Sequence, residues 1–146
     1  LKRWRGPYPE DVFIAQFEKV ADGFAKAEHH LIEAVDKGHH TGGPVSAHRE
    51  LDVARAARVH LASVAHQARF IRARDALDKA APEQRPTLVA EMRNALGAEA
   101  ALAKELYGLQ RRDSRIGFEA SNHYFYLGQD LVEKAINCAW LAARWR

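Results

Sequence analysis

The chain has 146 residues, of which 47% are hydrophobic and 28% charged, and its formal net charge is +3. This composition is typical of one globular domain with a single core. No apolar run approaches the ~20 residues that a transmembrane helix needs, so we expect no membrane contact. The arginines are dispersed among acidic residues and no nucleic-acid-binding motif is visible, so we expect no nucleic-acid partner.

The first predicted helix spans residues 9–37. Pro9 suits the first helical position, and Glu10 and Asp11 complement the positive end of the helix dipole. The apolar residues recur at alternating steps of four and three, which predicts a seam packed lengthwise on another helix. The predicted seam consists of Phe13, Phe17, Val20, Phe24, Ala27, Leu31 and Ala34. Gly38 is expected to end the helix.

The second predicted helix spans residues 47–79 and carries an apolar line beside a polar edge. The apolar line is Ala54, Ala57, Leu61, Val64, Ala68 and Ile71, and the edge is His60, Ser63, Gln67, Phe70 and Arg74. A buried charge needs a partner, so we expect Arg74 to pair with Glu99 or with Asp113. This edge either forms an interhelical network that fixes the register of the helices or lines a cleft.

The third predicted helix spans residues 86–110, and the last spans 129–144. The third aligns Leu88, Met92, Leu96, Glu99, Leu102, Leu106 and Leu109, and the last aligns Leu131, Ala135, Cys138, Ala142 and Trp145. No strand-type alternation persists along the chain. Four long amphipathic segments with short connections predict an all-α fold, an antiparallel helical bundle of about four long helices in a single domain, 1–146.

Eight histidines raise the question of a metal site. His29 and Glu33 lie four residues apart on the first predicted helix, but no HExxH motif and no Cys/His pair at zinc-finger spacing occurs. A di-iron bundle site would need Glu-x-x-His on two helices, which is also lacking. We therefore expect no metal and no other cofactor, and we expect His29 to lie on a solvated helix end.

The segment GFEASNHYFY (117–126) interrupts the helical pattern. If it is helical, a carboxylate, an amide, an imidazole and a phenol share one face. These groups belong to Glu119, Asn122, His123 and Tyr126. Such a set suits sugar hydroxyls, and Arg115 just upstream adds a charged donor. The alternative is that these side chains tie the segment to the second and third helices. No nucleophile or second carboxylate accompanies Glu119, so we expect no catalytic residue here.

Three blocks of the sequence resemble the C-terminal helical region of large bacterial TIM-barrel proteins that are similar to glycoside hydrolases. The blocks are SVAHQARFIRARDAL (63–77), RRDSRIGFEASNHYFY (111–126) and QDLVEKAINC (129–138), and the resemblance covers about residues 1–138. It implies a carbohydrate-active parent whose main catalytic carboxylates lie in the barrel. The positions that it places nearest a sugar are Arg115, Glu119, Asn122, His123, Tyr124 and Tyr126. The family pattern has prolines where this chain has Gly108 and Gly128.

The chain begins with Leu1 and its only methionine is Met92, so we expect a piece of a longer polypeptide. We expect a helical accessory domain that packs on a catalytic barrel and lends the 115–126 segment to the rim of a carbohydrate site. Without that barrel, an exposed apolar face would make the isolated chain self-associate. The alternative is a free-standing helical interaction or structural module. Its docking surface would then be Trp4, Trp140 and Trp145 with the basic chain ends.

Overall fold

The computed structural model describes residues 1–39, 46–119, 123–124 and 126–145. Within these residues the chain forms four helices, α1 (Glu10–His39), α2 (Ser46–Leu77), α3 (Arg85–Arg112) and α4 (Gly128–Arg144). Their ends lie within two residues of the predicted ones, so the predicted all-α bundle is confirmed. A short ladder, β1 (Phe118–Glu119) and β2 (His123–Tyr124), separates α3 from α4.

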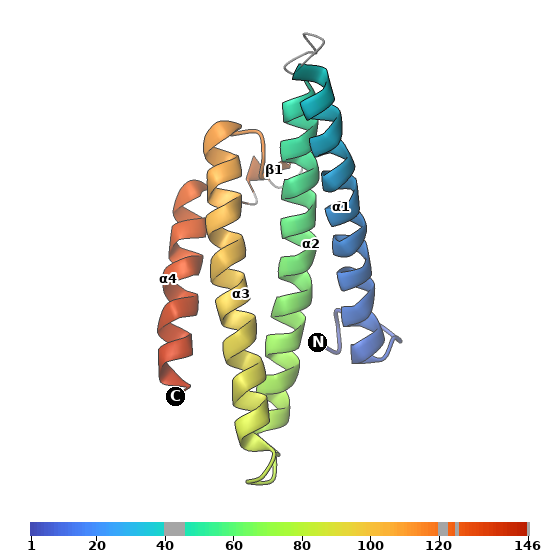
Figure 1. Ribbon diagram of the computed structural model, residues 1–146. Coiled ribbons are helices and arrows are strands. Elements are labelled where there is room, and N and C mark those ends of the chain that lie inside the picture. The colour runs from blue at the N-terminus through green and yellow to red at the C-terminus, as the bar shows by residue number, and fades with distance from the viewer. Residues whose placement is uncertain (40–45, 120–122, 125, 146) are drawn as a thin grey trace.

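The helices lie side by side in chain order, and each runs antiparallel to the one before it (Figure 1). α1 packs on α2, α2 on α3 and α3 on α4, while no other pair of helices in the described ranges brings Cα atoms within 8 Å. α2 and α3 are therefore interior helices, and α1 and α4 are edge helices. Within the same ranges, no helix combines the length and the apolarity of a membrane span.

Three apolar clusters hold neighbouring helices together. The first joins α1 and α2 and contains Ile14, Ala65 and Ala68, with Phe13 and Phe17 at its margin. The second joins α2 and α3 through Ala73, Leu77 and Met92, and Trp145 from the end of the chain packs against it. The third joins α2, α3 and α4 through Val59, Leu106, Leu109, Ile116 and Leu131. The small alanines of α2 let both neighbours approach the central helix closely.

The predicted seam of α1 is right along one of its two lines and wrong along the other: Phe17, Phe24 and Leu31 are half-buried, but the buried line beside them is shifted by one residue. Ile14, Ala21 and Val35 are buried, and Glu28 continues the same heptad series, while Val20 on the predicted line is exposed. The apolar pattern alone gave no reason to place a glutamate on the seam. Arginines of α2 hold this carboxylate, which is why a charge can lie there.

The described residues of segment 113–127 are not helical, so Glu119, His123 and Tyr126 do not share the face that a helix would have given them, and Asn122 lies outside the described residues. Phe118 pairs with Tyr124 and Glu119 with His123 in an antiparallel ladder. Gly117 has φ +94, and a Cβ atom at this position would lie 2.9 Å from the Tyr126 carbonyl oxygen. The chain thus folds back on itself at a point where only glycine fits.

Candidate functional site

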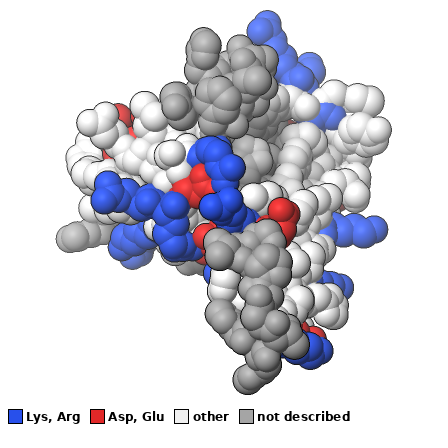
Figure 2. Space-filling view, turned by 90° about the horizontal axis from the view of Figure 1, so that it is seen from above, with Lys and Arg blue, Asp and Glu red and all other residues white. Residues whose placement is uncertain are grey.

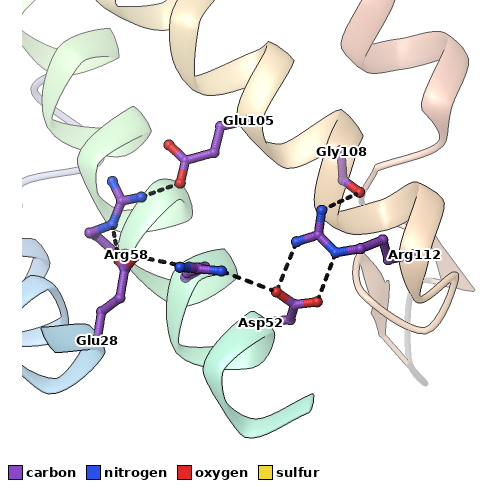
Figure 3. Close-up of polar contacts among 7 residues, drawn as sticks. Glu28, Asp52, Arg58, Glu105, Gly108 and Arg112 are labelled. Atoms are coloured by element: carbon purple, nitrogen blue, oxygen red, sulfur yellow. Dashed lines mark hydrogen bonds and ion pairs between the residues drawn. The ribbon is translucent and has the colours of Figure 1, made fainter. Parts of the chain in front are cut away.

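An ion-pair network joins α1, α2 and α3 (Figure 3). Glu28 accepts hydrogen bonds from Arg55 at 2.9 Å and Arg58 at 2.8 Å, and Arg58 also pairs with Glu105 of α3. Burial by itself raises the pKa of Glu28, but the hydrogen bonds from both arginines outweigh it, and the net pKa lies below its ordinary value. The network therefore links three helices through Arg58 of α2, which binds one carboxylate from α1 and one from α3.

The same network continues to the end of α3. Arg55 lies 3.7 Å from Asp52, whose two carboxylate oxygens accept from Arg112 at 3.1 and 2.8 Å. Arg112 also donates to the Gly108 carbonyl at 3.2 Å. In space, acidic and basic side chains thus alternate along the network, which runs from Glu105 of α3 through α2 and α1 and back to Arg112 of α3. The sequence showed the interleaving of the charges, but not which of them meet.

The predicted partners of Arg74 were wrong. Arg74 is exposed and binds the neighbouring Asp75 at 3.1 and 2.8 Å. Glu99 is instead held by Lys134, which reaches in from α4. The prediction failed because a helical projection does not show which neighbouring helix supplies the countercharge.

A polar cluster lies buried where α2, α3 and α4 meet. Glu99 Oε2 accepts from Ser63 at 2.9 Å and lies 2.5 Å from the Lys134 ammonium, while its other oxygen is buried without a hydrogen-bond partner in the described ranges. Lys134 also donates to Ser63 at 2.8 Å, and Gln67 donates to Ser63 at 2.9 Å. Two members of the predicted polar edge, Ser63 and Gln67, are therefore part of an interhelical network. That outcome agrees with the structural interpretation of the edge.

His60 and Tyr126 form a second interior contact, which ties the end of the 117–126 segment to α2. The Tyr126 hydroxyl lies 2.7 Å from His60 Nδ1, and the two rings meet edge to face. Burial lowers the pKa of His60, and the Lys134 ammonium lowers it further, so the ring is neutral at pH 7. Burial and the charge of Glu99 raise the pKa of Tyr126. Both side chains line a small cavity of about 10 Å³, which has room for no more than a water molecule.

The six residues predicted to lie near a sugar fall into two groups. Glu119, His123 and Tyr124 have described backbones only, and Asn122 lies outside the described residues. The structure places the other two, Arg115 and Tyr126, in different surroundings. The Tyr126 hydroxyl points inward to His60, whereas Arg115 is 72% exposed and forms a two-point pair with Asp113 at 2.9 and 2.5 Å.

Arg115 belongs to an open polar cleft at the end of the molecule where α2 begins and α3 ends. The cleft has a volume of about 340 Å³. It is lined by His48, Arg49, Asp52, Arg112, Asp113 and Arg115. Hydrogen bonds from the Arg115 side chain and backbone lower the pKa of Asp113 to about 2, so its carboxylate is ionised under all ordinary conditions. Sequence reasoning missed Arg49 and Arg112, whose positions near helix ends were the available signal.

An apolar groove of about 620 Å³ lies between α3 and α4. Tyr107 of α3 forms one wall, and Leu127, Val132 and Ile136 form the other. The exposed apolar line of α4 continues to Trp140, which is 57% exposed and carries the guanidinium of Arg144 over its ring at 4.6 Å. Val132, Ile136 and Trp140 follow one another at steps of four, so they form a single ridge.

His29 and His30 lie on the surface of α1, as expected for His29. His29 lies 3.1 Å from Glu33, and both side chains are largely exposed. Over the described ranges, no three histidine, cysteine, aspartate or glutamate side chains are grouped closely enough to hold a metal ion. The only cysteine, Cys138, is buried on α4, where burial raises its thiol pKa.

Comparison with known proteins gives no relative. No protein-family model, no curated protein sequence and no solved structure matches the chain.

Proposed function

We propose that this chain is a helical accessory domain that packs on a partner domain through the α3–α4 groove and the outer ridge of α4. The observation that carries this proposal is the ridge of Val132, Ile136 and Trp140, of which the first two line the groove, on an edge helix whose outer side is covered by no other helix of the described residues. Apolar surface of this extent and continuity is typical of a contact with another protein. Tryptophan is also among the residues most enriched at the centres of interfaces.

The chemistry of the ridge favours a helix as the contacting element. Side chains at steps of four form the ridge that packs into the groove of a facing helix. A TIM barrel presents an outer ring of helices, so the barrel implied by the sequence resemblance would supply such a surface. The carbohydrate-active parent rests on that resemblance, and the docking role rests on the ridge.

The position of the groove also supports a contribution to the rim of a substrate site. Arg111 lines the apolar groove, and the next residue, Arg112, lines the polar cleft that contains Arg115. A domain docked on α3 and α4 would therefore lie next to the 113–127 segment. In this arrangement the accessory domain supplies polar contacts while its partner performs the chemistry.

The test is binding between this chain and the separately expressed remainder of its reading frame, measured by calorimetry. Trp140→Ala and Ile136→Ala should each weaken binding, with Trp140→Ala costing at least about 2 kcal/mol because a buried aromatic anchor is lost. Val53→Ala is the matched control, since Val53 is an exposed valine on α2 outside the groove. Equal losses for Trp140→Ala and Val53→Ala would overturn the assignment of the surface.

The two sequence-based alternatives have distinct outcomes in the same experiment. A reading frame that encodes no other domain would favour the free-standing interaction module. Concentration-dependent dimerisation of the chain alone, abolished by Ile136→Glu, would show that a second copy covers the ridge instead. A panel of aryl glycosides should give no turnover with the isolated chain.

A further inference from the structure

The polar cleft at the beginning of α2 differs from the α3–α4 groove because its walls are mainly polar. Seen from this end of the molecule, Lys and Arg side chains gather around a smaller number of acidic ones (Figure 2). Its volume of about 340 Å³ lies within the range of small-molecule sites in proteins.

Both carboxylates of the cleft are already engaged. Asp52 accepts a two-point pair from Arg112, and Asp113 accepts a two-point pair and a backbone N–H from Arg115. These two-point pairs neutralise both carboxylates and hold the guanidinium groups of Arg112 and Arg115 in fixed orientations. Neither carboxylate therefore needs a cation from solution.

Positive charge remains after this pairing. Arg49 is exposed and has no hydrogen bond or ion pair within the described ranges, and Arg115 Nη1 likewise donates no hydrogen bond there. Arg49 is close enough to contribute to the electrostatic environment of Asp113, which places its charge at this cleft. The free groups are all donors, so they fit an acceptor-rich anion.

We propose that the cleft is a binding site for the phosphate group of a small phosphorylated ligand, held by Arg49 and Arg115. Two guanidinium groups from different elements can bind different edges of a tetrahedral dianion, whereas one guanidinium group is enough to hydrogen-bond both oxygens of a planar carboxylate. Arg49 lies in the first turn of α2, where the helix dipole adds a favourable potential for an anion. The site uses residues outside the docking ridge, so it goes beyond the proposed accessory role.

The experiment is an NMR titration of the whole chain, read from the arginine Nε–Hε signals and the cleft backbone, at low ionic strength. The probes are inorganic phosphate, glucose 1-phosphate and glucuronate. Both phosphates should shift the signals of Arg49 and Arg115 with saturation, and glucuronate should bind at least about threefold more weakly. Arg49→Gln should weaken phosphate binding about tenfold because it removes one of the two charged donors.

Arg93→Gln is the matched control, because it removes the same charge from an exposed site on α3 far along the chain from the cleft. Thermal unfolding should be nearly unchanged in Arg49→Gln, since Arg49 is exposed and forms no hydrogen bond or ion pair with another described residue. No saturable shift with phosphate, or equal weakening by Arg93→Gln, would overturn the site. Glucuronate that binds as tightly as glucose 1-phosphate would overturn the phosphate assignment. Failure of this titration leaves the docking proposal standing, since Trp140 and Ile136 are not involved.

Discussion

Replacing Lys134 by methionine tests whether the buried Glu99 cluster holds α4 in place. The Glu99 side chain is only 6% exposed, and Lys134, 27% exposed, is the only cation among the described residues that binds it. Of the donors in that part of the chain, Lys134→Met leaves the carboxylate with the Ser63 hydroxyl alone. Removing one partner of a buried ion pair costs ~3–5 kcal/mol, and partial water access to Lys134 places the expected loss near the lower end, about 3 kcal/mol.

The assay is urea unfolding followed by circular dichroism, with Lys104→Met as the control. Lys104 is an exposed lysine on α3, so the control should change the free energy of unfolding by less than about 0.5 kcal/mol. The double variant Glu99→Leu/Lys134→Met replaces both charges by apolar groups and should recover most of the loss.

A loss below about 1 kcal/mol for Lys134→Met would refute this reasoning, because a buried and uncompensated carboxylate costs more. A double variant as unstable as the single one would refute it too. That result would mean that Lys134 acts through the packing of its side chain and not through its charge. Hydrogen exchange can then show whether α4, as an edge helix, opens on its own.

Gly117→Ala should destabilise the fold by about 1–3 kcal/mol, because φ +94 and a carbonyl 2.9 Å from the added Cβ both oppose it. Gly23→Ala should stabilise the fold by about 0.5–1 kcal/mol, because no neighbouring atom lies within 4 Å of the added Cβ. Equal melting temperatures for Gly117→Ala and Gly23→Ala would contradict this difference. Burial first, and then the charge of Lys134, lower the pKa of His60 below 6.5, which an NMR titration should show. Because the unfolded chain then binds the proton more readily, the contribution of His60 to the free energy of unfolding should be lost as the pH falls below about 6.5. The same pH profile in His60→Gln would contradict this assignment. Burial raises the pKa of the Cys138 thiol, so its alkylation near about pH 8 should be slower than that of a free thiol. The opening of α4 should limit the alkylation rate.

The seam of α3 could be predicted in detail, and the seam of α1 could not. Met92, Leu96, Glu99 and Leu109 are buried as expected, because α3 packs on both sides and a wide stripe must be apolar. α1 packs on α2 alone, so a narrow stripe suffices and neighbouring lines of residues fit the pattern equally well. Glu28 decided between them through contacts with arginines from α2.

The residues of the candidate sites likewise divide into those that the sequence identified and those that only the structure showed. Arg115 was identified from its place beside the interrupted helical pattern, but the chain reversal at Gly117 was not predicted. Arg49 was missed, because its position near a helix end does not show that it reaches the cleft, which forms only when α2 and α3 are adjacent. The inward direction of Tyr126 likewise depends on His60, which is distant in the chain.

The sequence by itself determined where the helices lie, because helical periodicity, prolines and glycines act over a few residues along the chain. It also determined that the fold is all-α. Only the tertiary structure decided that the helices form an open row, since the order of packing depends on contacts between distant residues. That arrangement gives Glu99 its partner on α4, closes Tyr126 against α2 and leaves the apolar ridge of α4 exposed.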